Sequence, residues 1–157
     1  MFSYDKIFLA YFFLSLNAFS CDPGFREVIS CSLPGYNTRS VTFCINDVTQ
    51  EIKYSFKKNG EIELSVMFND ANKLRRLKDD DVGAIYYGFS RGYYSYVITI
   101  LEGKEKNEYS MNFYITKKNK VIQSDDCTSY AYRDPIIASR YIEEASPQRI
   151  GKGEAFP

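Results

Sequence analysis

Short strand-like segments separated by turn residues fill most of this chain and limit the folds that it can adopt. β-Branched and aromatic residues recur in these segments with a period of two, the pattern of strands with one face buried. We expect eight strands, at residues 26–33, 40–45, 51–56, 61–68, 82–89, 93–101, 108–116 and 120–123. Because turns link most of them directly, the sequence predicts an all-β fold, an antiparallel meander forming a β-sandwich or small barrel.

The connections divide into tight turns and two longer segments. Residues 57–60 and 117–119 carry the Lys-Lys-Asn sequence, and 90–92 contains a glycine, as hairpin turns do. Residues 69–81 are charged, with only two large apolar side chains, so we expect a loop with one helical turn at most. Asp134 followed by Pro135 is typical of a helix start, and apolar residues near helical spacing predict a short helix at 135–145.

The amino-terminal residues have the features of an export signal. Residues 7–16 form an apolar run, well short of the ~20 residues that span a bilayer. Small residues at Ala18 and Ser20 suit a signal peptidase, so we expect cleavage after Ser20 and a periplasmic or secreted protein. The alternative is an apolar strand or helix in a cytosolic core. The sequence thus predicts a signal peptide at 1–20, a disulfide-bonded β domain at 21–127 and a C-terminal extension at 128–157, with little order from 146 onward.

Four cysteines remain after this cleavage, and an even number in an exported chain predicts two disulfides. A turn centred between residues 37 and 38 would place Cys31 opposite Cys44 in a hairpin. We therefore expect a Cys31–Cys44 bridge, which leaves Cys21 to pair with Cys127. Lipid anchoring through Cys21 is a less favoured alternative, because Phe19 stands where a lipoprotein signal has a small residue.

Charge and missing residue types exclude several chemistries. The chain has 20 basic and 20 acidic residues, so it offers no overall attraction to nucleic acid or to an anionic membrane. It has no histidine, which removes Ser-His-acid and Cys-His catalysis, and no C-x-x-C pair that would suggest metal binding. Carboxylates at 79–81, 61 and 63, and 125–126 leave an acid-dependent hydrolase or a calcium loop as weaker alternatives. We expect no enzymatic activity, no cofactor, no metal and no stable membrane span.

The segment 86–96 is the densest unusual feature of the chain. Its sequence, YYGFSRGYYSY, has the tyrosine, serine, glycine and arginine content of protein-binding surfaces. The alternative is that its aromatics pack the core on one face and form cross-strand pairs on the other, and alternation alone does not tell which tyrosines face outward. The candidate binding residues are Tyr87, Ser90, Arg91, Tyr93, Tyr94 and Tyr96.

The order of these parts also carries a resemblance at the level of pattern. Its elements are 28–31, 41–44, 52–56, 63–66, the 88–96 hairpin and 118–122 running to Cys127. Over 21–127 this order resembles that of small, mostly uncharacterised periplasmic β proteins of Gram-negative bacteria. It is more distantly similar to periplasmic lysozyme inhibitors, β-barrel proteins that plug an active site with a Ser-Gly-x-x-Tyr loop and often bridge an early cysteine to a late one. In residues 90–94 of this chain, Arg91 separates the serine from the glycine.

Together these features predict an exported, non-enzymatic protein-binding domain. The resemblance implies a role as an inhibitor or immunity protein, with a cell-wall-degrading hydrolase of the envelope as partner. The alternative is a carbohydrate or small-ligand binding module in which exposed tyrosines stack on the ligand. The identity of the partner and the oligomeric state stay open at this stage.

Overall fold

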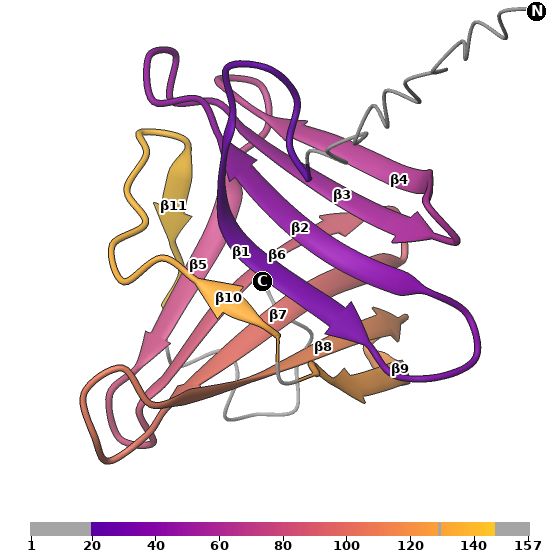
Figure 1. Ribbon diagram of the computed structural model, residues 1–157. Coiled ribbons are helices and arrows are strands. Elements are labelled where there is room, and N and C mark those ends of the chain that lie inside the picture. Colours follow the sequence, from indigo (N-terminus) through magenta and orange to yellow (C-terminus); the bar gives the residue numbers. More distant parts are fainter. Residues whose placement is uncertain (1–19, 129, 147–157) are drawn as a thin grey trace, which may run out of the picture.

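The computed structural model describes residues 20–128 and 130–146, which form two β-sheets facing each other (Figure 1). The first sheet has the order β10-β1-β2-β3-β4 and the second β11-β5-β6-β7-β8-β9. The strands of the first sheet are β1 (Arg26–Leu33), β2 (Arg39–Ile45), β3 (Ile52–Lys58), β4 (Glu61–Phe68) and β10 (Tyr132–Arg133). Those of the second are β5 (Leu74–Asp79), β6 (Ala84–Arg91), β7 (Tyr94–Glu102), β8 (Tyr109–Lys117), β9 (Lys120–Asp126) and β11 (Ile142–Glu144).

The predicted all-β class and all eight predicted strands are confirmed. The predicted signal peptide, apart from Ser20, and the C-terminal residues from 147 onward lie outside the described residues. No part of the chain that the structure describes forms a helix of the length and apolarity needed to cross a membrane.

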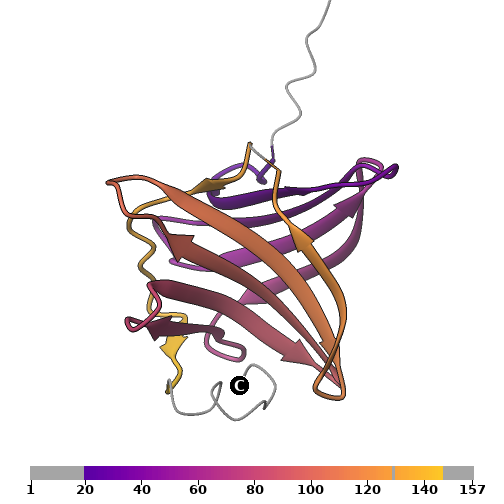
Figure 2. The ribbon, with the colours of Figure 1, turned by 90° about the horizontal axis from the view of Figure 1, so that it is seen from below.

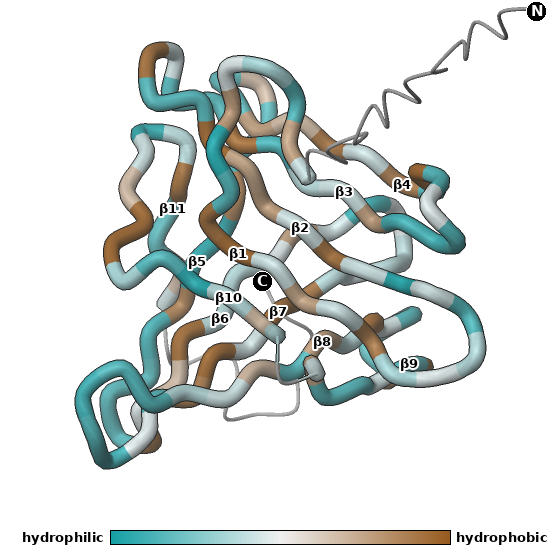
Figure 3. The backbone as a smooth tube through the Cα atoms, viewed as in Figure 1, coloured by the Kyte–Doolittle hydropathy of each residue, from teal (hydrophilic) through white to brown (hydrophobic). Residues whose placement is uncertain are grey.

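Aromatic side chains from both sheets meet in the shared core. The Tyr54 and Phe68 rings of the first sheet pack edge-on against Phe89 of the second, with centroids 4.8 and 5.4 Å away. Phe56 is stacked on Phe113 across the two sheets, with ring centroids 6.0 Å apart. Along the strands hydrophobic residues alternate with less hydrophobic ones, whereas the connections are mostly hydrophilic, as Figure 3 shows. The alternation that identified the strands is therefore also what joins the sheets.

Both disulfides form, but the predicted pairing was wrong. The bridges are Cys21–Cys44 and Cys31–Cys127. In the β1–β2 hairpin Cys31 lies opposite Val41, so the turn is centred on residue 36 rather than between 37 and 38. Cys31 then shares the inward face with Val41, while Cys44, three residues further on, points to the other face. The two sulfurs cannot meet across the strands, and Cys31 reaches Cys127 at the end of β9 instead.

Two further predictions were wrong, and both errors concern the strands β5 and β11, which pair with each other. Residues 69–81, expected as a loop, contain β5, and residues 135–145, expected as a helix, run extended into β11. β11 pairs with β5 in parallel, so the meander is not wholly antiparallel. Side-chain bonds to the backbone compete with the helix: the Ile136 amide donates to Asp134 (3.1 Å), and the Ser139 hydroxyl donates to the Gln50 carbonyl (2.6 Å). The extended chain of β11 also provides hydrogen-bond partners for the backbone groups at the edge of β5.

Four hairpin turns surround one side of the molecule. In the first sheet the Asn59 amide donates to the Thr38 carbonyl, joining the turns after β1 and β3. In the second sheet the Lys118 amide donates to the Tyr93 carbonyl, joining the turns after β6 and β8. Gly60 has a φ of 81°, which a residue with a side chain adopts only with strain, and it fits the predicted Asn-Gly turn. Figure 2 shows both pairs of turns on one side, with the sheets spread apart between them.

Candidate functional site

The structure distributes the six predicted binding residues over different surroundings. Tyr87 is only 4% exposed and packs beneath Arg76, whose guanidinium carbon lies 5.9 Å from its ring centroid. Burial raises the pKa of Tyr87, against a hydrogen bond from Arg76 that lowers it, so this phenol belongs to the packed interior. The Ser90 hydroxyl bonds to that of Ser95 at 2.9 Å. These two hairpin residues contribute to packing and cross-strand pairing.

The tip of the hairpin is the exposed part. Tyr93 is 72% exposed, and Arg91 also faces solvent. The Lys118 ammonium lies 5.2 Å from the Tyr93 ring centroid, and Lys117 lies 5.4 Å from that of Tyr94. The tip therefore presents aromatic rings next to lysine and arginine side chains, a combination that protein interfaces use often.

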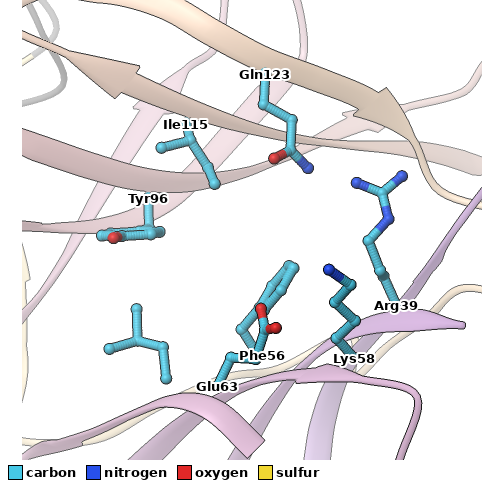
Figure 4. Close-up of a pocket in the computed structure, with 8 residues that line it drawn as sticks. Arg39, Phe56, Lys58, Glu63, Tyr96, Ile115 and Gln123 are labelled. Carbon is cyan, nitrogen blue, oxygen red and sulfur yellow. The ribbon is translucent and has the colours of Figure 1, made fainter. Parts of the chain in front are cut away.

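Tyr96, the last predicted binding residue, lies in a cleft between the two sheets at the side where the four turns gather. The cleft has a volume of about 430 Å³. Six strands contribute its lining, which consists of Arg39, Phe56, Lys58, Glu63, Leu64, Tyr96, Ile115 and Gln123. Figure 4 shows Tyr96, Ile115 and Gln123 extending from the second sheet toward Phe56, Lys58 and Glu63 of the first.

One part of this lining is apolar. Phe56, Leu64 and Ile115 are partly buried and pack against the core. Tyr96 is stacked on Phe89 at a centroid distance of 5.1 Å and on Tyr94 at 6.5 Å. Burial raises the pKa of Tyr96, and the neighbouring Tyr94 raises it further, so the phenol stays neutral at physiological pH. The interior of the cleft is thus hydrocarbon and aromatic surface.

The other part is polar. Arg39 is held in place: its Nη1 lies 3.4 Å from Asp125 Oδ2, and its Nη2 donates to the Pro34 carbonyl at 2.7 Å. Gln123 donates to the same Asp125 oxygen at 2.8 Å. Lys58 and Glu63 make no ion pair with any described residue. A fixed guanidinium and a free ammonium therefore stand at the cleft.

The acidic residues singled out in the sequence do not gather. Glu63 lines the cleft, Asp125 is paired with Arg39, and in the 79–81 loop the Asp81 amide donates to the Asp79 carboxylate. Among the residues that the structure describes, no three acidic, cysteine or histidine side chains form a group that could hold a metal ion.

No protein-family model, curated protein or solved structure matches this chain. The function of the chain is therefore inferred from the geometry of the cleft and of the hairpin tip. Sequence reasoning found Tyr96 and the tip but missed the rest of the cleft, because its residues come from strand ends far apart in the chain.

Proposed function

We propose that this chain is an exported, non-enzymatic binding protein of the cell envelope that holds a small, partly apolar ligand in the cleft between its sheets. The observation that carries the proposal is the cleft lining: apolar surface from Phe56, Leu64, Tyr96 and Ile115 with a few polar groups beside it. Its volume of about 430 Å³ falls in the range of small-molecule sites, ~300–1,000 Å³. Two disulfides and the apolar run at 7–16 support a periplasmic or secreted location.

The lining favours a hydrocarbon or aromatic ligand over a sugar. A sugar site offers many hydrogen-bonding groups and a free aromatic face, whereas half of the lining residues here are apolar or aromatic. The Tyr96 ring is already stacked with two rings of the protein itself. We therefore assign Tyr96 to the wall of the cleft and not to a stacking platform for carbohydrate.

The exposed hairpin tip favours a second candidate, binding of a protein partner. Tyr93 is largely exposed beside Arg91 and Lys118, and such aromatic and arginine anchors dominate many protein interfaces. Inhibition of an envelope hydrolase belongs to this candidate. It would use a surface outside the cleft, so the two functions are separable by mutation.

Binding of N-phenyl-1-naphthylamine, a neutral apolar probe whose fluorescence rises on binding, tests the first candidate. Ile115→Trp fills the cleft and should weaken probe binding at least tenfold. Ile122→Trp makes the same chemical change at an exposed position and is the matched control. Equal probe binding by both variants, with unchanged circular dichroism, would eliminate the cleft as the site. An Arg91→Ala/Tyr93→Ala variant should bind the probe normally and lose only a protein partner.

A further inference from the structure

Two pairs of like charges lie at the strand ends on the side of the cleft, one pair on each sheet. Arg39 is the direct cross-strand partner of Lys58, and both line the cleft. On the facing sheet, Lys117 is the cross-strand partner of Lys120. Like charges in directly opposed positions destabilise a sheet. Only Arg39 of these four side chains has an acidic partner among the described residues, so the repulsion is left largely uncompensated.

These pairs belong to a wider basic rim. The turns and strand ends around the cleft carry seven basic side chains and three acidic ones. The basic residues of the rim are Arg39, Lys57, Lys58, Arg91, Lys117, Lys118 and Lys120; the acidic ones are Glu61, Glu63 and Asp125. The connections at the far ends of the strands, at 46–51, 69–73, 79–83 and 102–108, are acidic instead, with nine acidic residues and three basic ones. The acidic residues are Asp47, Glu51, Asp70, Asp79, Asp80, Asp81, Glu102, Glu105 and Glu108; the basic ones are Lys73, Lys104 and Lys106. A chain that is neutral in total is therefore polarised, with a surplus of four basic residues at the rim and of six acidic residues at the far ends.

We propose that the ligand of the cleft is a single-chain amphiphile with an anionic head group, a carboxylate or a phosphate monoester. This inference rests on the proposed function and specifies its ligand class. The hydrocarbon chain lies against Phe56, Leu64, Tyr96 and Ile115, and the head lies at Arg39 and Lys58.

Charge and size both support this ligand. Arg39 is fixed by Asp125 and the Pro34 carbonyl, so a guanidinium is already oriented at the cleft. A carboxylate or phosphate placed between Arg39 and Lys58 replaces their repulsion by two charge-assisted contacts. The cleft volume of about 430 Å³ lies near the lower end of small-molecule sites, ~300–1,000 Å³, which suits one hydrocarbon chain better than two. The basic rim attracts such an anion from solution.

Displacement of N-phenyl-1-naphthylamine from the mature chain tests the proposal with four ligands of equal chain length: decanoate, decyl phosphate, decanol and decyltrimethylammonium. Decanoate and decyl phosphate should displace the probe at concentrations about tenfold lower than decanol, as expected for one charge-assisted contact. The cationic ligand should be the weakest.

Lys58→Met is the informative variant, and Lys104→Met, in the loop between β7 and β8, is the matched control. Lys58→Met should weaken decanoate about tenfold and leave decanol unchanged, while Lys104→Met changes neither. Because Lys58→Met also removes the repulsion with Arg39, its thermal midpoint without ligand should be equal to or above that of the parent chain.

The outcomes separate this inference from the proposed function. Equal displacement by decanoate and decanol, with normal probe binding, would overturn the anionic head while leaving an apolar site in place. A failure of the probe to bind at all would remove the proposed function and this inference together. If inorganic phosphate competes as well as decyl phosphate, the hydrocarbon chain contributes nothing to binding, and this part of the proposal is overturned. If the chain co-sediments with anionic phosphatidylglycerol vesicles and decanoate does not displace the probe, the proposed ligand is overturned. The basic rim would then bind the surface of an anionic membrane.

Discussion

The two disulfides should contribute unequally to stability because they close loops of very different length. The Cys31–Cys127 bridge joins residues separated by 96 positions, and the Cys21–Cys44 bridge joins residues separated by 23. The loop-closure entropy removed from the unfolded chain then corresponds to about 4.7 kcal/mol for the first bridge and about 3.4 kcal/mol for the second. Cys31 and Cys44 are both buried, so the cavities left by alanine at these positions are similar and largely cancel in the comparison.

Urea unfolding of C31A/C127A and C21A/C44A, followed by circular dichroism, measures this difference. With a slope of about 2 kcal/mol per M, the midpoint should fall by about 2.4 M in the first variant and about 1.7 M in the second. Thiol titration of the unfolded variants checks the pairing independently, since each should retain one intact bridge and no free thiol. Two free thiols in either variant, or a larger loss of stability in C21A/C44A, would refute the reasoning.

Three further predictions concern single side chains. Tyr54→Phe should raise the free energy of unfolding by about 1 kcal/mol, because the buried Tyr54 hydroxyl has no hydrogen-bond partner among the described residues; an unchanged or lower urea midpoint would contradict this. Burial, followed by the neighbouring Tyr86, raises the pKa of Tyr114 to about 12. The unfolded chain therefore loses this proton first, and stability should fall as pH rises from about 10 to about 12, less steeply in Tyr114→Phe, which pH-dependent thermal melts can measure. Gly60→Ala should destabilise the chain by about 1 kcal/mol because its φ is 81°, and no shift in the urea midpoint would argue against this turn.

The strands were predictable because their signal is local. Alternation and turn residues lie within each hairpin, so the strand positions in β1 to β4 and β6 to β9 follow from short windows of sequence. β5 lacks that signal. Leu74 belongs to the main core and Leu77 to a second cluster, so its two apolar side chains point to opposite faces of the sheet. The sequence of β5 therefore shows neither the two-residue period of a strand nor the 3.6-residue period of a helix. β11 forms by pairing with β5 more than sixty residues earlier, as in Glu144 beside Arg76. No short window contains that partner.

The cleft was less predictable than the fold because six strands contribute to it. Tyr96 was found through local composition. Arg39 and Lys58 indicate a binding site only once the register of β2 and β3 is known to place them opposite each other. The available signal was the topology of the predicted hairpins. The lysine-rich turns at 57–60 and 117–119 are the third and seventh connections between the eight predicted strands, and every second connection of a meander lies at the same end. That argument could have placed the basic side chains together before the structure was known.

The polarisation of this neutral chain follows from the same topology. In an antiparallel meander, consecutive connections lie at opposite ends of the strands and every second connection returns to the same end, so any bias of lysine toward one set of turns separates the charges in space. Exposed charges of opposite sign at the two ends lie further apart than the screening length of ~8 Å at physiological ionic strength, so they neutralise each other little. A ligand at the cleft therefore meets the local basic rim and not the total charge of zero. The total charge alone is thus a poor guide to the partners of a hairpin-rich fold, and the sign at each set of turns has to be considered separately.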